Sequence, residues 1–134
     1  MGAEQSIPRV LIADDDDDVR AVLATQLRDE FEVVANARDA DEAIALAAEH
    51  QPDIAIVDVQ MPGGGGPSAT RGIRSAAAGT AIVALSSDES ERIVLEMLTA
   101  GAVTYLRKGV SGSELADLLR EALRARRRLD GPGA

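Results

Sequence analysis

A chain of 134 residues that is 46% hydrophobic, with one Phe, one Tyr and no Trp, is long enough for a single domain with an aliphatic core. It has no cysteine, which excludes disulfides and thiolate chemistry, and its formal charge of -9 argues against nucleic-acid binding, which needs a basic surface. No apolar run approaches the roughly 18 residues of a membrane span, and residues 1–6 lack the basic start of a secretory signal. We therefore expect a soluble, cytoplasmic protein.

The first predicted unit is a strand followed by a helix. Residues 1–8 read as a lead-in, and the apolar run Arg9–Ala13 predicts a strand. The acidic residues 14–18 then supply the end of that strand, a loop and a helix N-cap, for which Asp is well suited. Helical spacing predicts that the core face of this helix carries Val19, Val22, Leu23 and Leu27.

A second strand and helix follow. Phe31–Asn36 predicts a short strand, and Asp39 with Glu42 three residues later is the pattern of a capping box. The helix after it has a narrow stripe of mostly alanine and ends near residues 50–52. We interpret His50, the only histidine, as a surface residue.

The stretch from Pro52 to Gly66 is the most informative part of the chain. Ile54–Val57 is a short β-branched run with turn residues on both sides, which predicts a buried parallel strand. It ends at Asp58, and open α/β sheets keep their ligand sites at the carboxyl ends of strands. Four consecutive glycines predict a loop, and Pro67 suits the first turn of a third helix running to about Ala76.

A fourth strand and helix are predicted next. The strand Ala81–Leu85 ends at Ser86, and Asp88 with Glu91 is a second capping-box pattern. Gly101 is placed to end the helix, as glycine commonly does. The residues expected to face the core from this helix are Ile93, Val94, Met97 and Leu98.

The last predicted strand, Val103–Arg107, is followed by Lys108, and Ser111 with Glu114 caps the last helix. We interpret the arginines near residues 124–128 as a solvated final turn, where cations suit the helix dipole. Five strands alternating with five helices predict an α/β protein with a doubly wound parallel sheet. The predicted domain spans residues 9–128, and residues 129–134 read as a linker or tail.

Candidate functional groups end four of the five strands, namely Asp14, Asp15, Asp58, Ser86 and Lys108. Parallel strands bring these ends to one edge of the sheet, so the side chains are expected to converge. Close carboxylates resist joint ionisation, and one Mg²⁺ with one lysine ammonium would neutralise three of them. Such a site suits phosphoryl transfer, in which an Asp carboxylate can be the nucleophile.

The chain resembles the receiver domains of two-component response regulators over about residues 8–127. The resemblance is in Val-Leu-Ile-Ala-Asp-Asp at 10–15, Pro-Asp-(four residues)-Asp-Val-Gln-Met-Pro at 52–62, Ala-Leu-Ser-Ser at 84–87 and Gly-Ala-(two residues)-Tyr-Leu-Arg-Lys at 101–108. It implies a flavodoxin-like fold with strand order 2-1-3-4-5. The chain departs from many receivers at Gly109, where they have proline, and in its glycine-rich loop at 63–66.

The resemblance also implies roles for individual residues. Asp58 would be the phosphoacceptor, and Lys108 would pair with the phosphoryl group. Ser86 would move toward that group on activation, and Tyr105 would swing inward with it. Mg²⁺ would be held by Asp15, by Asp14 through water, by Asp58 and by the backbone carbonyl of Gln60. Gln60 and Asp88 match the two positions that tune the dephosphorylation rate.

By the same resemblance, a sensor histidine kinase would be the phosphodonor. The readout, and a homodimer contact, would use the face formed by the fourth helix, fifth strand and fifth helix. The domain would catalyse only its own phosphorylation and dephosphorylation, and we expect it to be the N-terminal part of a longer regulator. The sequence leaves two alternatives: a degenerate receiver that only binds proteins, and a Mg²⁺-dependent phosphatase with an Asp nucleophile.

Overall fold

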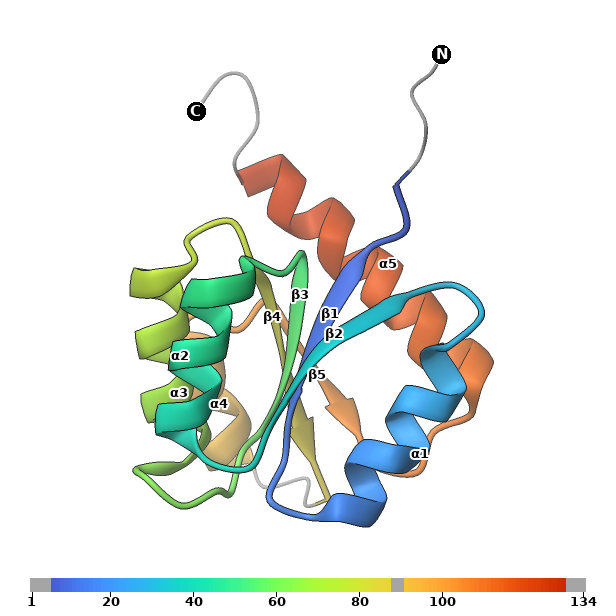
Figure 1. Cartoon of the computed structure of the whole chain (residues 1–134). Coiled ribbons are helices and arrows are strands. Elements are labelled where there is room, and N and C mark those ends of the chain that lie inside the picture. Colours follow the sequence, from blue (N-terminus) through green and yellow to red (C-terminus); the bar gives the residue numbers. More distant parts are fainter. Residues whose placement is uncertain (1–5, 88–90, 130–134) are drawn as a thin grey trace.

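The structure is a computed structural model that describes residues 6–87 and 91–129. Strands and helices alternate along the described chain (Figure 1). The elements in order are β1 (Arg9–Ala13), α1 (Asp17–Leu27), β2 (Glu32–Ala37), α2 (Ala40–His50), β3 (Ile54–Asp58), α3 (Gly65–Ala76), β4 (Ala81–Ser86), α4 (Glu91–Ala100), β5 (Thr104–Arg107) and α5 (Gly112–Leu129).

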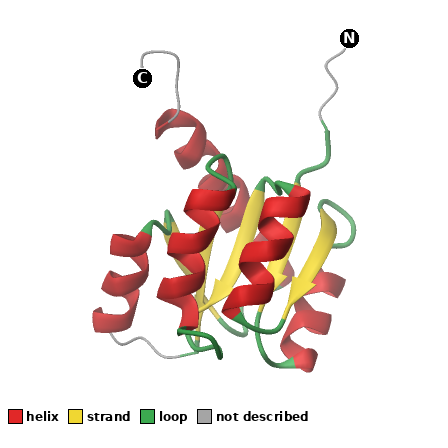
Figure 2. Cartoon of the chain, turned by 60° about the vertical axis from the view of Figure 1, so that its left-hand side comes forward, coloured by secondary structure: helices red, strands yellow, loops and turns green. Residues whose placement is uncertain are grey.

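The strands form one parallel sheet in the order β2-β1-β3-β4-β5, which confirms the predicted doubly wound fold. Helices α2, α3 and α4 cover one face of the sheet, and α1 and α5 cover the other (Figure 1). The turned view of Figure 2 shows the sheet between these two helical layers. Each strand therefore ends at the same edge, with the loops that lead into the helices.

Each face of the sheet has its own aliphatic core, and β3 contributes to both. Ala55 and Val57 pack in the cluster under α2, α3 and α4. Ile54 and Ile56 pack in the cluster under α1 and α5. Every residue of β3 is buried, because helices cover both faces of this central strand. That two-sided burial explains why the strand is an unbroken apolar run until Asp58.

The structure corrects several details of the predicted elements. The last strand begins at Thr104 and not Val103, and Leu129 belongs to α5 and not to the predicted tail. The second strand begins at Glu32 and not Phe31, because the Phe31 N–H donates to the Leu27 carbonyl oxygen at the end of α1. Val22 is 56% exposed and Leu98 is 39% exposed, so neither faces the core as predicted. Each lies one residue from a buried position, which on a helix is a rotation of about 100° away from the core.

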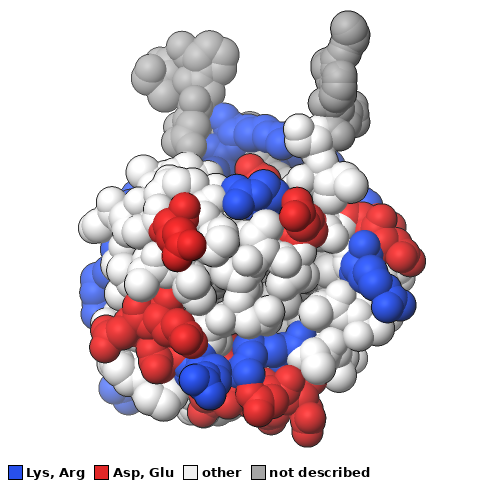
Figure 3. Space-filling view, in the orientation of Figure 1, with Lys and Arg blue, Asp and Glu red and all other residues white. Residues whose placement is uncertain are grey.

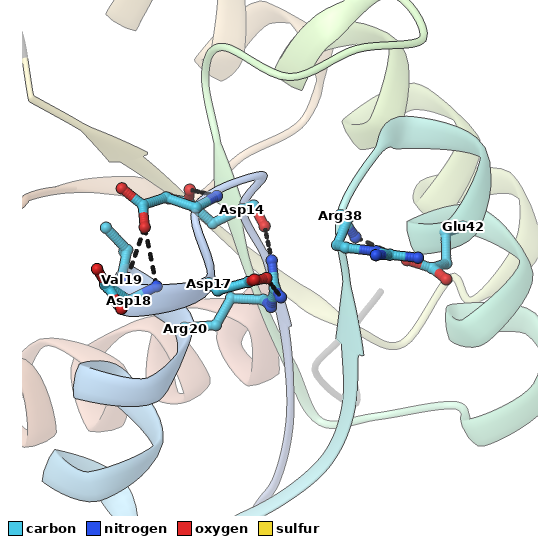
Figure 4. A network of polar contacts seen from close by, with 8 residues as sticks. Asp14, Asp17, Asp18, Val19, Arg20, Arg38 and Glu42 are labelled. Carbon is cyan, nitrogen blue, oxygen red and sulfur yellow. Dashed lines mark hydrogen bonds and ion pairs between the residues drawn. The ribbon is translucent and has the colours of Figure 1, made fainter.

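The helix caps follow the predicted patterns with one difference. Ser111 and Glu114 form the reciprocal capping box, with both backbone-to-side-chain bonds at 3.2 Å. The Asp39 carboxylate accepts from the Glu42 N–H at 2.8 Å, but the Glu42 carboxylate accepts from the Arg38 N–H and not from Asp39 (Figure 4). The second predicted box depends on Asp88, which lies outside the described residues.

Gly66 is required by a close approach at the start of α3. A Cβ at this position would lie 2.6 Å from the Asp58 carbonyl oxygen and 2.7 Å from the Val59 Cα. The Gly66 N–H also donates to the Val59 carbonyl oxygen at 3.0 Å. The glycine therefore lets α3 begin directly against the end of β3, where Asp58 lies.

Within the described residues, no helix is long and apolar enough to cross a membrane.

Candidate functional site

The predicted residues converge at the carboxyl edge of the sheet, at the bottom of Figure 1. Asp14 follows β1, Asp58 ends β3, Ser86 ends β4 and Lys108 follows β5. The Lys108 N–H donates to the Ser86 carbonyl oxygen at 2.9 Å, which continues the pairing of β4 and β5 past the last strand residue. Acidic side chains gather at this lower end of the molecule, interspersed with basic ones (Figure 3).

The Lys108 ammonium is shared between two buried carboxylates. Its Nζ lies 3.0 Å from Asp14 Oδ2 and 3.5 Å from Asp58 Oδ1. Asp14 is completely buried and Asp58 is 4% exposed. Burial alone would lower the pKa of Lys108, but its contacts with Asp14 and Asp58 outweigh burial and raise that pKa above its ordinary value. Lys108 is therefore a fixed positive charge beside both carboxylates.

Asp58 is an unusual carboxyl group. Burial, followed by the charge of Asp14, raises its pKa from 3.8 to about 6. A hydrogen bond from the Gln60 N–H to Asp58 Oδ1 at 3.3 Å and the charge of Lys108 act in the opposite direction. These two contacts fix the orientation of the carboxylate, while its burial next to like charge makes the ionised form costly.

Three carboxylates are placed to hold a cation. Oxygen atoms of Asp14, Asp15 and Asp58 all lie within 4.8 Å of one another. Asp14 Oδ2 is buried and receives no well-formed hydrogen bond from the described residues, although the Lys108 ammonium faces it. A hard, oxygen-preferring divalent cation would relieve the repulsion in this set, so the residues fit such an ion.

Arg20 was not singled out from the sequence, and it holds the loop that presents Asp14. Its Nη1 donates to the Asp14 carbonyl oxygen at 2.6 Å, and its Nη2 pairs with the Asp17 carboxylate (Figure 4). In the same loop, the Asp16 N–H donates to Asp14 Oδ1 at 2.9 Å, and Asp16 is the N-cap of α1. In the sequence, these contacts of Arg20 are indicated only by the spacing of Asp17 and Arg20, which lie one helical turn apart.

The other predicted site residues differ in how far their side chains are exposed to solvent. Ser86 is buried at the end of β4, Gln60 is exposed just after Asp58, and Tyr105 on β5 is 42% exposed. Asp88 lies outside the described residues.

Comparison with known proteins assigns this arrangement to a family. A family model for the response regulator receiver domain matches residues 10–120. The chain belongs to this family. It is a receiver domain of two-component response regulators.

The receiver is similar to several bacterial proteins. It is 41% identical over 115 residues to the transcriptional regulatory protein PdtaR of Mycobacterium tuberculosis, covering 84% of this chain and 56% of PdtaR. It superposes with a TM-score of 0.82 on a LuxR-family two-component response regulator from Aurantimonas, with 33% identity and coverage of 90% and 88%. For the receiver domain of the putative response regulator NarL from M. tuberculosis, the TM-score is 0.84 at 27% identity, covering 90% and 98%.

The receiver spans about half the length of the curated relatives that it matches. Several of these relatives are named as transcriptional regulatory proteins. The strand order and the five helices are those of the family, as the resemblance implied.

Proposed function

We propose that this receiver accepts a phosphoryl group on Asp58, with Mg²⁺ as cofactor and a sensor histidine kinase as donor. The observation that supports this most is the Lys108 ammonium, paired at once with Asp14 Oδ2 and Asp58 Oδ1 in a site that also holds Asp15. A solvated structural ion pair would not need three carboxylates within 4.8 Å of one another at the converging ends of strands.

In the proposed transfer, an oxygen of the Asp58 carboxylate forms the new bond to phosphorus. The P–N bond of the donor phosphohistidine breaks, and the imidazole leaves with the electron pair and takes up a proton. With acetyl phosphate as donor the P–O bond breaks and acetate leaves. Hydrolysis by water then returns Asp58 to a carboxylate and releases inorganic phosphate, which resets the switch.

In this scheme the remaining residues orient the reacting groups and balance their charge. Lys108 attracts the phosphoryl oxygens, and the Gln60 N–H keeps the Asp58 carboxylate in place. Asp15, Asp58 and the Gln60 carbonyl would hold Mg²⁺, with Asp14 acting through water, and the ion would stabilise negative charge on the transferring group. Ser86 would donate a hydrogen bond to a phosphoryl oxygen once the group is in place.

We also propose that phosphorylation is read out on the face formed by α4, β5 and α5. On α4, Leu95 is 64% exposed and Leu98 is 39% exposed, and Tyr105 on β5 is 42% exposed. Isolated exposed apolar side chains are common, but three on elements that are consecutive in the chain offer a contact surface for a second copy or an output domain. Movement of Ser86 and Tyr105 would change this face. In a longer regulator, an output domain would follow α5.

The direct test is intact mass after incubation with Mg²⁺ and acetyl phosphate. We expect a gain of about 80 Da that is lost in Asp58→Ala and in chelator, as metal-assisted transfer to Asp58 requires. Asp29→Ala, an exposed loop carboxylate outside the site, is the matched control and should gain the same mass.

No mass gain by the wild type under any condition, together with no binding of Mg²⁺, would contradict the proposal. It would favour a degenerate receiver that acts only by binding other proteins. Continuous release of phosphate from added phosphoesters would favour the alternative of a phosphatase.

A further inference from the structure

A polar hollow adjoins Asp58 on the side of α4. It has a volume of about 290 Å³. Its lining residues are Val59, Gln60, Ser86, Ser87, Arg92, Ile93 and Glu96. Val59 and Gln60 directly follow Asp58, and Ser86 ends the neighbouring strand β4. The hollow is thus part of the same sheet edge as the phosphoacceptor, and it has room for a small polar group.

Arg92 brings a positive charge to this hollow. Its side chain is exposed, and it makes no ion pair or hydrogen bond within the described residues. Two other cations at this edge are already engaged, because Lys108 pairs with Asp14 and Asp58 and Arg20 pairs with Asp17. Arg92 therefore has a guanidinium available for an incoming anion.

Charge counting indicates why a further cation is needed after phosphorylation. A phosphoryl group has a charge of about −2 near neutral pH, so with Asp14 and Asp15 the occupied site holds about −4. One divalent cation and Lys108 together supply +3, which leaves an excess of about one negative charge. A guanidinium has the planar donor geometry that matches two phosphoryl oxygens at once.

We propose that Arg92 is a second phosphoryl-binding residue, and that the hollow it lines with Gln60 and Ser86 is the subsite for the phosphoryl oxygens of phosphorylated Asp58. This inference rests on the proposed function, because it assigns the group that holds its product. Arg92 would thereby set the affinity for the tetrahedral phosphoryl anion and the lifetime of the acyl phosphate. It would not contribute to binding the metal in the free protein.

The chain offers a matched control in Arg71. Arg71 and Arg92 both line a second hollow between α3 and α4, so both are exposed arginines of one neighbourhood. Arg71 does not line the hollow beside Asp58. A difference between variants at these two positions would therefore report a specific contact and not the loss of one positive charge from this surface.

The test uses beryllium trifluoride as a phosphoryl mimic, titrated in Mg²⁺ into the wild type, Arg92→Gln, Arg92→Lys and Arg71→Gln. We expect Arg92→Gln to bind the mimic about 3- to 10-fold more weakly, the size of one partly solvated charged hydrogen bond. Arg92→Lys should recover part of the lost affinity, since it keeps the positive charge but not the paired N–H donors of the guanidinium. Arg71→Gln should match the wild type.

Three further measurements separate binding from folding. The Mg²⁺ affinity of Arg92→Gln without fluoride should equal that of the wild type, and so should its thermal midpoint. The Arg92 Nε–H resonance in the wild type should shift when the mimic is added. If Arg92→Gln binds the mimic as well as the wild type, or if Arg71→Gln loses as much as Arg92→Gln, the inference is wrong while the proposed function stands. If the wild type binds neither the mimic nor a phosphoryl group, the proposed function itself fails.

Discussion

The Arg20 guanidinium donates a hydrogen bond of 2.6 Å to the backbone carbonyl oxygen of Asp14. The same side chain pairs with Asp17 in the first turn of α1, and only 13% of it is exposed. It therefore joins the end of β1 to the start of α1 across the acidic loop. The chain of contacts fixes the backbone that presents Asp14 and Asp15 without using either carboxylate.

We predict that Arg20→Met lowers the free energy of unfolding by about 1–2 kcal/mol. The reason is that the Asp14 carbonyl oxygen loses a charge-assisted hydrogen bond. Urea denaturation without divalent cations measures this difference. Arg28→Met is the control: Arg28 is an exposed arginine at the end of α1, and its variant should stay within about 0.5 kcal/mol of the wild type. Equal losses of unfolding free energy in the two variants would show that the contacts of Arg20 with Asp14 and Asp17 do not stabilise the fold specifically.

The raised pKa of Asp58 predicts that this residue destabilises the metal-free fold at neutral pH. Its pKa is 3.8 when exposed and about 6 in the fold, so the native state binds more protons than the unfolded state between these values. Stability without metal should therefore fall as the pH rises from about 4 to about 6. Asp58→Asn removes the buried charge, and it should be more stable than the wild type by about 1–3 kcal/mol at pH 7.5.

Denaturation in chelator at several pH values checks this prediction. The advantage of Asp58→Asn should shrink below pH 6 and disappear as the pH falls below 3.8, where the wild-type carboxyl becomes protonated in both states. Asp29→Asn, at an exposed loop position, should show no such pH-dependent gain. An advantage of Asp58→Asn that is the same at every pH would contradict an origin in burial of the charge.

Divalent cations should stabilise the wild type through the three clustered carboxylates. At a Mg²⁺ concentration of 100 times the dissociation constant, linkage predicts a gain of about 2.7 kcal/mol in unfolding free energy. Asp15→Asn should lose most of this gain, because Asp15 belongs to the cluster. Asp18→Asn should keep it, because Asp18 is an exposed acid in the first turn of α1 outside the cluster. Thermal unfolding with and without Mg²⁺ compares the variants, and equal gains would argue against a site at Asp15.

Much of the fold could be predicted because burial on two sides leaves a strong pattern. The unbroken apolar run of β3 that ends in Asp58 marked both the strand and the site, and the alternation of strands and helices indicated the parallel sheet. The strand order itself came from the resemblance to receivers. Neither periodicity nor composition determines which strand lies next to which.

Apart from residues at strand ends such as Phe31, the residues that were wrongly placed or missed lie on helices. Val22 and Leu98 were placed in the core because apolar residues at helical spacing are expected there. In the structure, the buried face of α1 and of α4 includes fewer residues than the apolar stripe in the sequence. Arg20 and Arg92 were missed because a polar residue at a helix start is usually solvated. Only the folded structure brings Arg20 to the Asp14 carbonyl oxygen and Arg92 to the hollow beside Asp58.

The last prediction concerns Gly66, where α3 begins against Asp58. Adding a Cβ would place it 2.6 Å from the Asp58 carbonyl oxygen, so the Gly66→Ala variant must move α3 or the end of β3. We expect unfolding free energy to fall by about 1–3 kcal/mol, as for overpacked cores. Gly79→Ala is the control, because no atom lies within 4 Å of its added Cβ, and it should be neutral or slightly stabilising. Because the added Cβ presses on the backbone of Asp58, Gly66→Ala should also slow phosphorylation of Asp58 by acetyl phosphate. Full stability together with a normal rate would show that the close approach is not required.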